Sequence, residues 1–346
     1  MILRRLRGTL PPPLLVLTER RSEGLPEQAP MVTSDGKGAV TFAGYSDASG
    51  SGADRFRSVA VVSGELQACL ALSDRLQAVA ADEAVRTVEW KFVKGDAGVQ
   101  RATEQYVNLG VTCACRGEIR VDVLTWDTYD SRHAVPGRDD TENLARMYYH
   151  LLVHAAQRGG GGTWRLCADE DASLGWSALL ECLERTQLIR RSEARASSLF
   201  RVEGERMVVE SFRECDSCGE CLIQLSDIFA GLGRWSHEKA KWLPTWVENL
   251  ERRAQVQKAL FDDMAADGVT GESRSDRARS RIVHLLDRLC KSRKLGVSLR
   301  TKGCLWTPGT RGPVNFWTYD PQSSLDVAPR RRERSGPEAL RQTDET

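Results

Sequence analysis

The sequence predicts a mixed α/β fold, in which helices pack on a sheet that contains both parallel and antiparallel strands. Two neighbouring apolar runs at residues 39–46 and 58–63, joined by a Gly-, Ser- and Asp-rich turn, predict a hairpin that opens the sheet. Strands then alternate with amphipathic helices as far as about residue 235. Two long helical patterns, at about 244–266 and 275–293, follow and indicate a helical C-terminal extension.

The helices between the strands are predicted from apolar residues at helical spacing. The expected helices occupy residues 65–80, 96–109, 140–157, 172–188 and 222–235. The further strands are expected at 118–126, 164–168 and 207–209, with a short extended piece at 88–92. The helix at 140–157 is the clearest, because its apolar residues recur every three to four positions and four consecutive glycines follow it.

The chain is expected to have four parts. These are a disordered leader (1–37), the α/β domain (38–240), a mainly helical extension packed on that domain (241–320) and a disordered tail (321–346). Three prolines interrupt the apolar stretch of the leader, which is too short to cross a bilayer. The tail is rich in Pro, Ser and Arg, which is typical of disorder. We expect no membrane partner.

Charge and cysteine content limit the class of protein. The 49 Lys and Arg balance 48 Asp and Glu, giving a formal net charge of +1, so no global field attracts nucleic acid or a membrane. Any attraction to polyanions must come from local patches. Ten cysteines spread over 346 residues are too sparse for a secreted disulfide scaffold. We therefore expect free thiols and a cytoplasmic location.

Two aspartates stand where a predicted strand runs into a turn. Asp47 lies in the segment YSDASG, and Asp169 repeats the arrangement in LCADED. Carboxylates at strand ends can converge beyond the sheet, where a helix-lined crevice offers a site. The alternative is that aspartate simply favours turns.

A third aspartate and a glutamate extend this set. Asp227 interrupts the apolar helical run IQLSDIFAGL, and a buried carboxylate there should be paired or bound to metal unless it lies on an exposed stripe. Glu89 and Lys91, in VEWKF, would share one face of an extended segment and act on one site. A surface ion pair is the simpler alternative for Glu89 and Lys91.

The four acids fall one per element, in the order first strand, mid-chain segment, later strand and late helix. This order resembles the ribonuclease H-like superfamily, whose acids hold one or two divalent ions. The motifs YSDASG, EWK, DED and IQLSDIFAG more narrowly resemble the domain-of-unknown-function family 3800 over about residues 40–235, and the closing VNFWTY at 314–319 extends the resemblance. Ala48 stands where that family commonly has a glutamate, which removes one candidate carboxylate.

The resemblance implies a ribonuclease H-like fold and a metal-dependent nuclease. Asp47, Glu89, Asp169 and Asp227 would bind Mg²⁺ or Mn²⁺, and Lys91 would contact the scissile phosphate. Two such ions about 4 Å apart can activate the attacking water and stabilise the leaving oxygen of a phosphodiester. Carboxylates alone would repel that substrate. A non-catalytic module that binds nucleic acid or a partner protein remains an alternative.

Three cysteines form a second candidate site. Cys215, Cys218 and Cys221 have the spacing C-x-x-C-x-x-C, which would let thiolates from a tight turn reach one Zn²⁺. The fourth ligand is not apparent, and Cys167, Cys182 or a histidine would have to be supplied through the fold. Free thiols and a redox or iron–sulfur role stay open. A zinc- or redox-responsive regulator is thus a further functional alternative.

Two local basic patches could meet nucleic acid. The segments 274–302 and 330–334 contain more Arg and Lys than acids and could neutralise phosphates. A solvated helix face and tail is the alternative. We expect nucleic acid as the partner, with a partner protein also open; the oligomeric state is not predicted.

Overall fold

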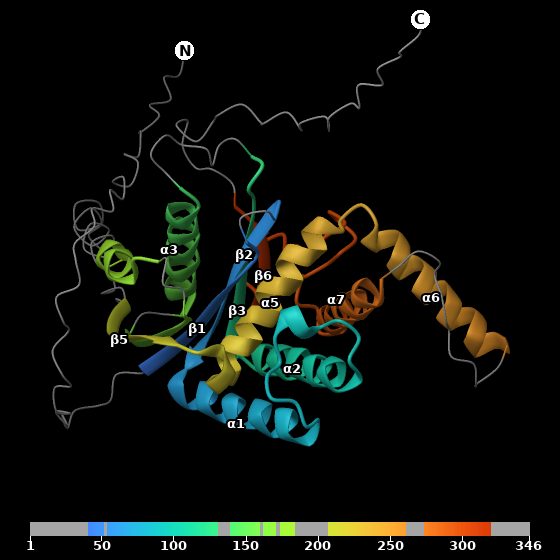
Figure 1. Cartoon of the computed structure of the whole chain (residues 1–346), viewed down its shortest axis with the longest axis horizontal. Coiled ribbons are helices and arrows are strands. Elements are labelled where there is room, and N and C mark those ends of the chain that lie inside the picture. The colour runs from blue at the N-terminus through green and yellow to red at the C-terminus, as the bar shows by residue number, and fades with distance from the viewer. Residues whose placement is uncertain are drawn as a thin grey trace, which may run out of the picture.

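The structure is a computed structural model of the 346-residue chain. It describes residues 41–51, 54–130, 139–159, 162–170, 174–183, 207–260 and 273–319. The expected leader and tail, and with them the basic segment 330–334, lie outside the described residues. Helices lie on both sides of a twisted sheet (Figure 1).

Six strands form one mixed sheet in the order β5-β4-β1-β2-β3-β6. The strands are β1 (Thr41–Ser49), β2 (Phe56–Glu65), β3 (Ile119–Asp127), β4 (Gly162–Asp169), β5 (Met207–Cys215) and β6 (Val314–Thr318). β2 pairs antiparallel with β1 and β3, whereas the pairs β1–β4, β4–β5 and β3–β6 are parallel. The predicted α/β class, the mixed sheet and the opening hairpin are therefore confirmed.

The helices agree in order with the sequence pattern. They are α1 (Leu66–Asp82), α2 (Ala97–Cys115), α3 (Asp140–Gly159), α5 (Cys221–Glu238), α6 (Leu243–Leu260) and α7 (Arg274–Ser292). The helix expected at 172–188 is described only in part, and residues 176–183 are helical. The expected extended piece at 88–92 is partly wrong, because the chain turns into a 3-10 helix, η1, at Trp90–Phe92. In the described parts of the chain no helix is long and apolar enough to cross a membrane.

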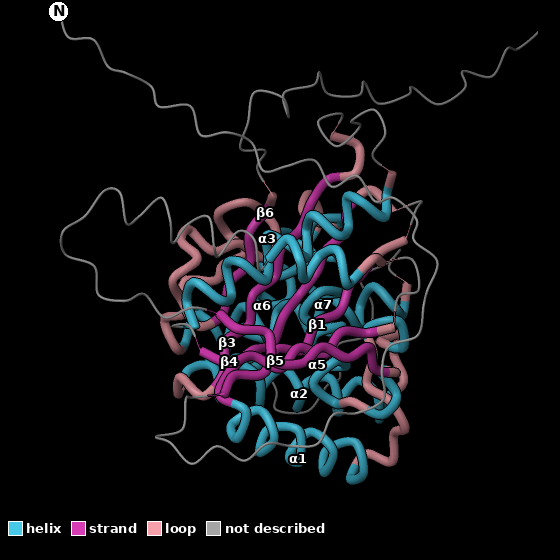
Figure 2. Tube along the Cα trace, turned by 90° about the vertical axis from the view of Figure 1, so that its left-hand side faces the viewer, coloured by secondary structure: helices cyan, strands magenta, loops and turns pink. Residues whose placement is uncertain are grey.

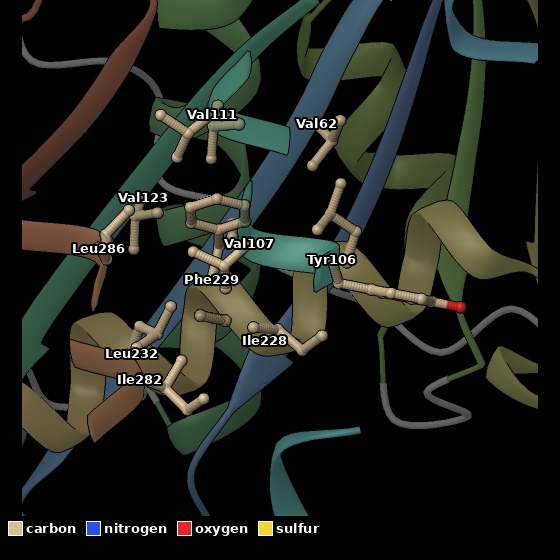
Figure 3. Close-up of a cluster of buried hydrophobic side chains, with 14 of the residues drawn as sticks. Val62, Tyr106, Val107, Val111, Val123, Ile228, Phe229, Leu232, Ile282 and Leu286 are labelled. Atoms are coloured by element: carbon tan, nitrogen blue, oxygen red, sulfur yellow. The ribbon is translucent and has the colours of Figure 1, made fainter. Parts of the chain in front are cut away.

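Two hydrophobic clusters place the sheet between two layers. On one face, α1, α2, α5 and α7 pack over Tyr45, Val62 and Val123. Figure 3 shows Phe229 of α5 inside this cluster, near Val123 of β3 and Leu286 of α7. On the other face, α3 and the helical residues 176–183 cover the sheet, and Figure 2 shows α3 and α1 on opposite sides of it.

The segment after residue 240 adds a strand to the sheet as well as helices. β6 pairs with β3 in a register that places Asn315 beside Asp122, and the Asn315 side-chain amide donates a hydrogen bond of 2.8 Å to the buried Asp122 carboxylate. α7 contributes Ile282 and Leu286 to the core that α2 and α5 form. The segment expected as a mainly helical extension therefore supplies the sixth strand of the same sheet.

Candidate metal centre

Asp47 and Asp169 follow the end of the parallel ladder between β1 and β4. The last residues paired in that ladder are Ser46 and Ala168, and the two aspartates come directly after them, although β1 itself continues beside β2 as far as Ser49. Because side chains alternate along a strand, Asp47 points to the same face as Tyr45, and Asp169 to the same face as Cys167. Tyr45 and Cys167 belong to the core beneath α5. Asp47 is only 8% exposed.

Asp227 is brought to this face by α5. The Ser226 hydroxyl donates a hydrogen bond of 2.8 Å to the carbonyl oxygen of Tyr45, and the Ser58 hydroxyl donates one to the carbonyl oxygen of Ala230. These two bonds tie α5 to β1 and β2 on either side of Asp227. The otherwise apolar helix therefore holds the Asp227 carboxylate inside the protein, close to Asp47.

Glu89 is positioned by two side chains of α5. The amide oxygen of Gln224 accepts a hydrogen bond of 3.1 Å from the backbone N–H of Val88, and Asp227 accepts one of 2.6 Å from that of Trp90. Glu89 lies between these two anchored residues. It is 4% exposed, so the predicted ion pair with Lys91 is not a purely surface pair, although Lys91 itself is 65% exposed.

A glycine of α5 makes room for the segment that carries Glu89. A Cβ atom on Gly231 would lie 2.1 Å from Cγ of the Trp90 indole. The ring can therefore pack directly on the helix, and its edge also meets Trp235 at a centroid distance of 6.4 Å. The glycine in the motif FAGL has a packing role at this site.

Ser217 connects Asp169 to Glu89. It begins the 3-10 helix η3 (Ser217–Gly219) directly after β5. Its hydroxyl donates a hydrogen bond of 3.2 Å to Glu89, and its backbone N–H donates one to Asp169. Ser217 does not stand out in the sequence, where its position between two cysteines of the C-x-x-C-x-x-C run is its one notable feature.

The carboxylates raise one another's affinity for protons. Burial, followed by the charges of Asp227 and Asp169, raises the pKa of Asp47 well above its usual range. Burial raises the pKa of Asp227 to about 7, against the opposing hydrogen bond from Trp90. Burial and the charge of Glu89 raise the pKa of Asp169. Full ionisation of this cluster is therefore costly without a compensating cation.

The four acids provide the hard oxygen ligands that Mg²⁺ and Mn²⁺ prefer. Their mutual repulsion would be relieved by a divalent ion, so the chemistry of the set fits such an ion. Within the described ranges, however, no group of three or more His, Cys, Asp or Glu has a ready-made metal-binding arrangement. The predicted ligands are thus brought to one site without being preformed as a coordination shell.

An arginine from α7 also reaches this site. The Arg279 guanidinium carbon lies 5.4 Å from the centroid of the Trp90 ring, and Nη2 lies 3.5 Å from the Trp90 carbonyl oxygen. The charges of Arg279 and Asp227 interact. Arg279 belongs to the basic segment 274–302, and only the packing of α7 on the domain brings it near the acids.

The three cysteines of the C-x-x-C-x-x-C run are not gathered. Cys215 forms a disulfide with Cys167 on the neighbouring strand, whereas Cys218 is exposed and Cys221 is half-buried beside Tyr106. The expectation of free thiols is wrong for this pair and agrees with the structure for the other eight cysteines. The zinc site remains a sequence prediction that this geometry does not support.

The fold and the acid cluster define an α/β protein with a buried carboxylate centre at one face of its sheet. Two curated proteins of Methanothermobacter thermautotrophicus are similar to the chain over most of its length. The uncharacterized protein ORF2' is 33% identical over 297 residues, which cover 83% of this chain and 97% of that protein. The uncharacterized protein ORF2 is 34% identical over 298 residues, covering 84% and 98%. The chain belongs to the family of these two proteins. No protein-family model matches it.

Proposed function

We propose that the chain is a ribonuclease H-like nuclease that hydrolyses phosphodiester bonds of DNA or RNA with Mg²⁺ or Mn²⁺. The observation that carries the proposal is the convergence of four acids from separate parts of the chain at one buried site. Asp47, Glu89, Asp169 and Asp227 would hold the metal. Such convergence is costly for folding, and costly groups of this kind are typical of functional sites.

The residues around the acids suit a phosphodiester substrate. A bound divalent ion would supply charge neutralisation and a more acidic water. Lys91 is exposed beside Glu89 and would contact the scissile phosphate. Asp227 and Gln224 would keep the Glu89 segment in place through the backbone of Trp90 and Val88.

The absence of a glutamate at position 48 does not weaken the proposal. Ala48 follows Asp47 on β1, so its side chain points to the opposite face of the sheet, where it packs with the cluster under α3. A carboxylate at this position would therefore start from the face away from Asp47. Ala48 is the main feature that favours the alternative of a non-catalytic binding module. Its position on the opposite face of the sheet makes it a weaker argument for that alternative.

The cysteine arrangement gives less support to a zinc-responsive regulator. Cys215 shares its disulfide with Cys167, which leaves Cys218 and Cys221 as the free thiols of the run. The cytoplasmic location stays a prediction from the overall cysteine content, and nucleic acid is proposed as the partner through local basic patches.

The test is cleavage by the purified protein. Single-stranded, double-stranded and hybrid oligonucleotides are incubated with Mg²⁺ or Mn²⁺, beside the variants Asp47→Asn and Asp227→Asn. Asp74→Asn is the matched control, since Asp74 is an exposed acid of α1. We expect metal-dependent cleavage that falls by about 100-fold or more in both site variants and persists in the control. Absence of cleavage by folded protein, or equal activity in all variants, would refute the nuclease.

A further inference from the structure

A cleft rich in arginine lies between the start of α2 and the first turns of α7. It has a volume of about 360 Å³, which is within the range of small-molecule sites. Four of its eight lining residues are arginines and none is acidic: Arg101 comes from α2, and Arg274, Arg277 and Arg281 come from α7. The cleft is therefore a local concentration of positive charge on a chain that is nearly neutral as a whole.

Among the residues that the structure describes, two of the four arginine side chains have partners and the other two have none. Arg101 pairs with Glu83 at 2.7 Å, and Arg274 donates a hydrogen bond of 2.6 Å to the carbonyl oxygen of Gly95. Arg277 and Arg281 form no ion pair within the described parts of the chain. They stand four positions apart on one helix face, where like charges destabilise the helix slightly. Helix stability therefore does not explain their placement.

The cleft is connected to the acid centre by one short segment. Residues 90–95 run beside α7, because Arg279 Nη2 lies 3.5 Å from the carbonyl oxygen of Trp90 and Arg274 reaches that of Gly95. Arg274 and Arg279, which contact the two ends of this segment, stand five residues apart on α7, and five residues of an α-helix rise about 7.5 Å. Between the two ends the segment exposes Lys91 and Phe92, and Phe92 is 44% exposed with the Lys91 Nζ 5.2 Å from its ring centroid.

We propose that the arginine cleft binds the phosphate backbone of a single-stranded polynucleotide next to the phosphate that is cleaved. The inference rests on the proposed nuclease function and assigns the path of its substrate. One guanidinium group can bind two phosphate oxygens at once, so Arg277 and Arg281 are the contacts that hold the strand. The exposed ring of Phe92 offers a stacking surface for a base on the way from the acids to the cleft.

The test measures binding without cleavage. The fluorescence anisotropy of a labelled oligothymidylate is followed with the full chain in EDTA, over a series of salt concentrations. The variant Arg277→Gln/Arg281→Gln is compared with Arg252→Gln/Arg311→Gln, which removes two exposed arginines outside both the cleft and the basic segment 274–302. We expect the cleft variant to bind about tenfold more weakly, with a salt dependence lower by about 1.4 log units per decade, as for two lost phosphate contacts on a single strand.

The control pair should keep most of its affinity, and Arg277→Lys/Arg281→Lys should restore much of the loss. Unchanged binding in the cleft variant, an equal loss in both glutamine pairs, or no binding by the wild-type chain would overturn the inference. Because the assay contains no metal, selective loss in the cleft variant stands even if the protein cleaves nothing. Conversely, normal binding by that variant of an active nuclease would refute the cleft alone.

Discussion

The carboxylate of Asp227 accepts a hydrogen bond of 2.6 Å from the backbone N–H of Trp90, so a proposed metal ligand also fixes the neighbour of another, Glu89. Gln224 lies three residues earlier on the same face of α5 and accepts from Val88 in the same way. A single helix therefore contributes one acid and positions a second. Substitutions on α5 should therefore affect both the stability of the fold and the metal site. A substitution of Asp47 should affect the metal site without destabilising the fold.

Replacing Asp47 by asparagine should stabilise the metal-free protein at neutral pH. The folded state buries this carboxylate among three others, and removal of such a burden commonly adds about 0.5–2 kcal/mol to the free energy of unfolding. Because the pKa of Asp47 is higher in the folded state than in the unfolded chain, the gain should be largest at neutral and alkaline pH. It should vanish as the pH falls below about 4, where the carboxyl becomes protonated in both states.

Thermal unfolding in EDTA, followed by circular dichroism across this pH range, measures the effect. Asp74→Asn is the control and should leave the stability unchanged. An Asp47→Asn protein that is less stable than wild type at neutral pH would show that the carboxylate has a structural role and would contradict this interpretation.

Replacing Gln224 by methionine should destabilise the protein by about 2–4 kcal/mol. Both ends of the buried amide are used, since it accepts from Val88 and donates a hydrogen bond of 2.7 Å to the carbonyl oxygen of Ser217. Methionine has a similar shape but leaves the Val88 N–H unsatisfied, at a cost of about 1–3 kcal/mol. It also removes the bond to the Ser217 carbonyl, worth about 0.5–1.5 kcal/mol, although that oxygen still accepts from the backbone N–H of Glu220. Urea denaturation provides the measurement. Gln105 is exposed and its amide donates a hydrogen bond to Glu83, so Gln105→Met should change stability by no more than about 0.5 kcal/mol.

Replacing Gly231 by alanine should displace Trp90 and with it the Glu89 segment. The added methyl group would overlap the indole, and overpacking of this kind costs about 1–3 kcal/mol. Tryptophan fluorescence and urea denaturation report the two effects. Gly219→Ala is a suitable control because an added Cβ there meets nothing within 4 Å. Wild-type stability and an unchanged spectrum in Gly231→Ala would exclude the proposed packing.

His237 should make the stability depend on pH between 6.5 and 4. Burial, aided by the charge of Lys302, lowers the pKa of His237 to about 4 in the folded state. Below pH 6.5 the histidine is protonated in the unfolded chain but stays neutral in the folded protein. The free energy of unfolding therefore decreases as the pH is lowered from 6.5 to 4, by about 3 kcal/mol in all. His237→Asn should remove this part of the slope in urea titrations. The same slope in both proteins would show that His237 titrates normally.

The sequence pattern was sufficient to predict the helices, the strands and the four acids. It was insufficient to predict the hydrogen bonds that connect the acids to one another. The helices and strands follow from local periodicity, and Asp47, Asp169 and Asp227 stand out because each is a charge at a strand end or inside an apolar run. The anchoring role of Gln224 and the link made by Ser217 depend on atoms that meet across more than a hundred residues. Local spacing carries no signal for such contacts.

The cysteines and the last strand illustrate the same point. The C-x-x-C-x-x-C run suggested that Cys215 belongs with its sequence neighbours. The pairing of β5 with β4 instead places Cys215 opposite Asp169, and its disulfide runs to Cys167, two residues earlier on β4. The run VNFWT is short and apolar, and only its pairing with β3 makes it an edge strand. In both cases the outcome depends on which strands pair in the folded protein, and tertiary packing determines that pairing.

The most direct measurement of the central claim is a calorimetric titration of the purified protein with Mn²⁺ at neutral pH, beside Asp47→Asn. The wild-type chain should bind Mn²⁺ with release of protons, since the pKa values of Asp47 and Asp227 are raised. The affinity for Mn²⁺ should fall at least about tenfold in the variant. Equal affinity in the two proteins, or no binding by the folded wild-type chain, would contradict a metal centre built on these carboxylates.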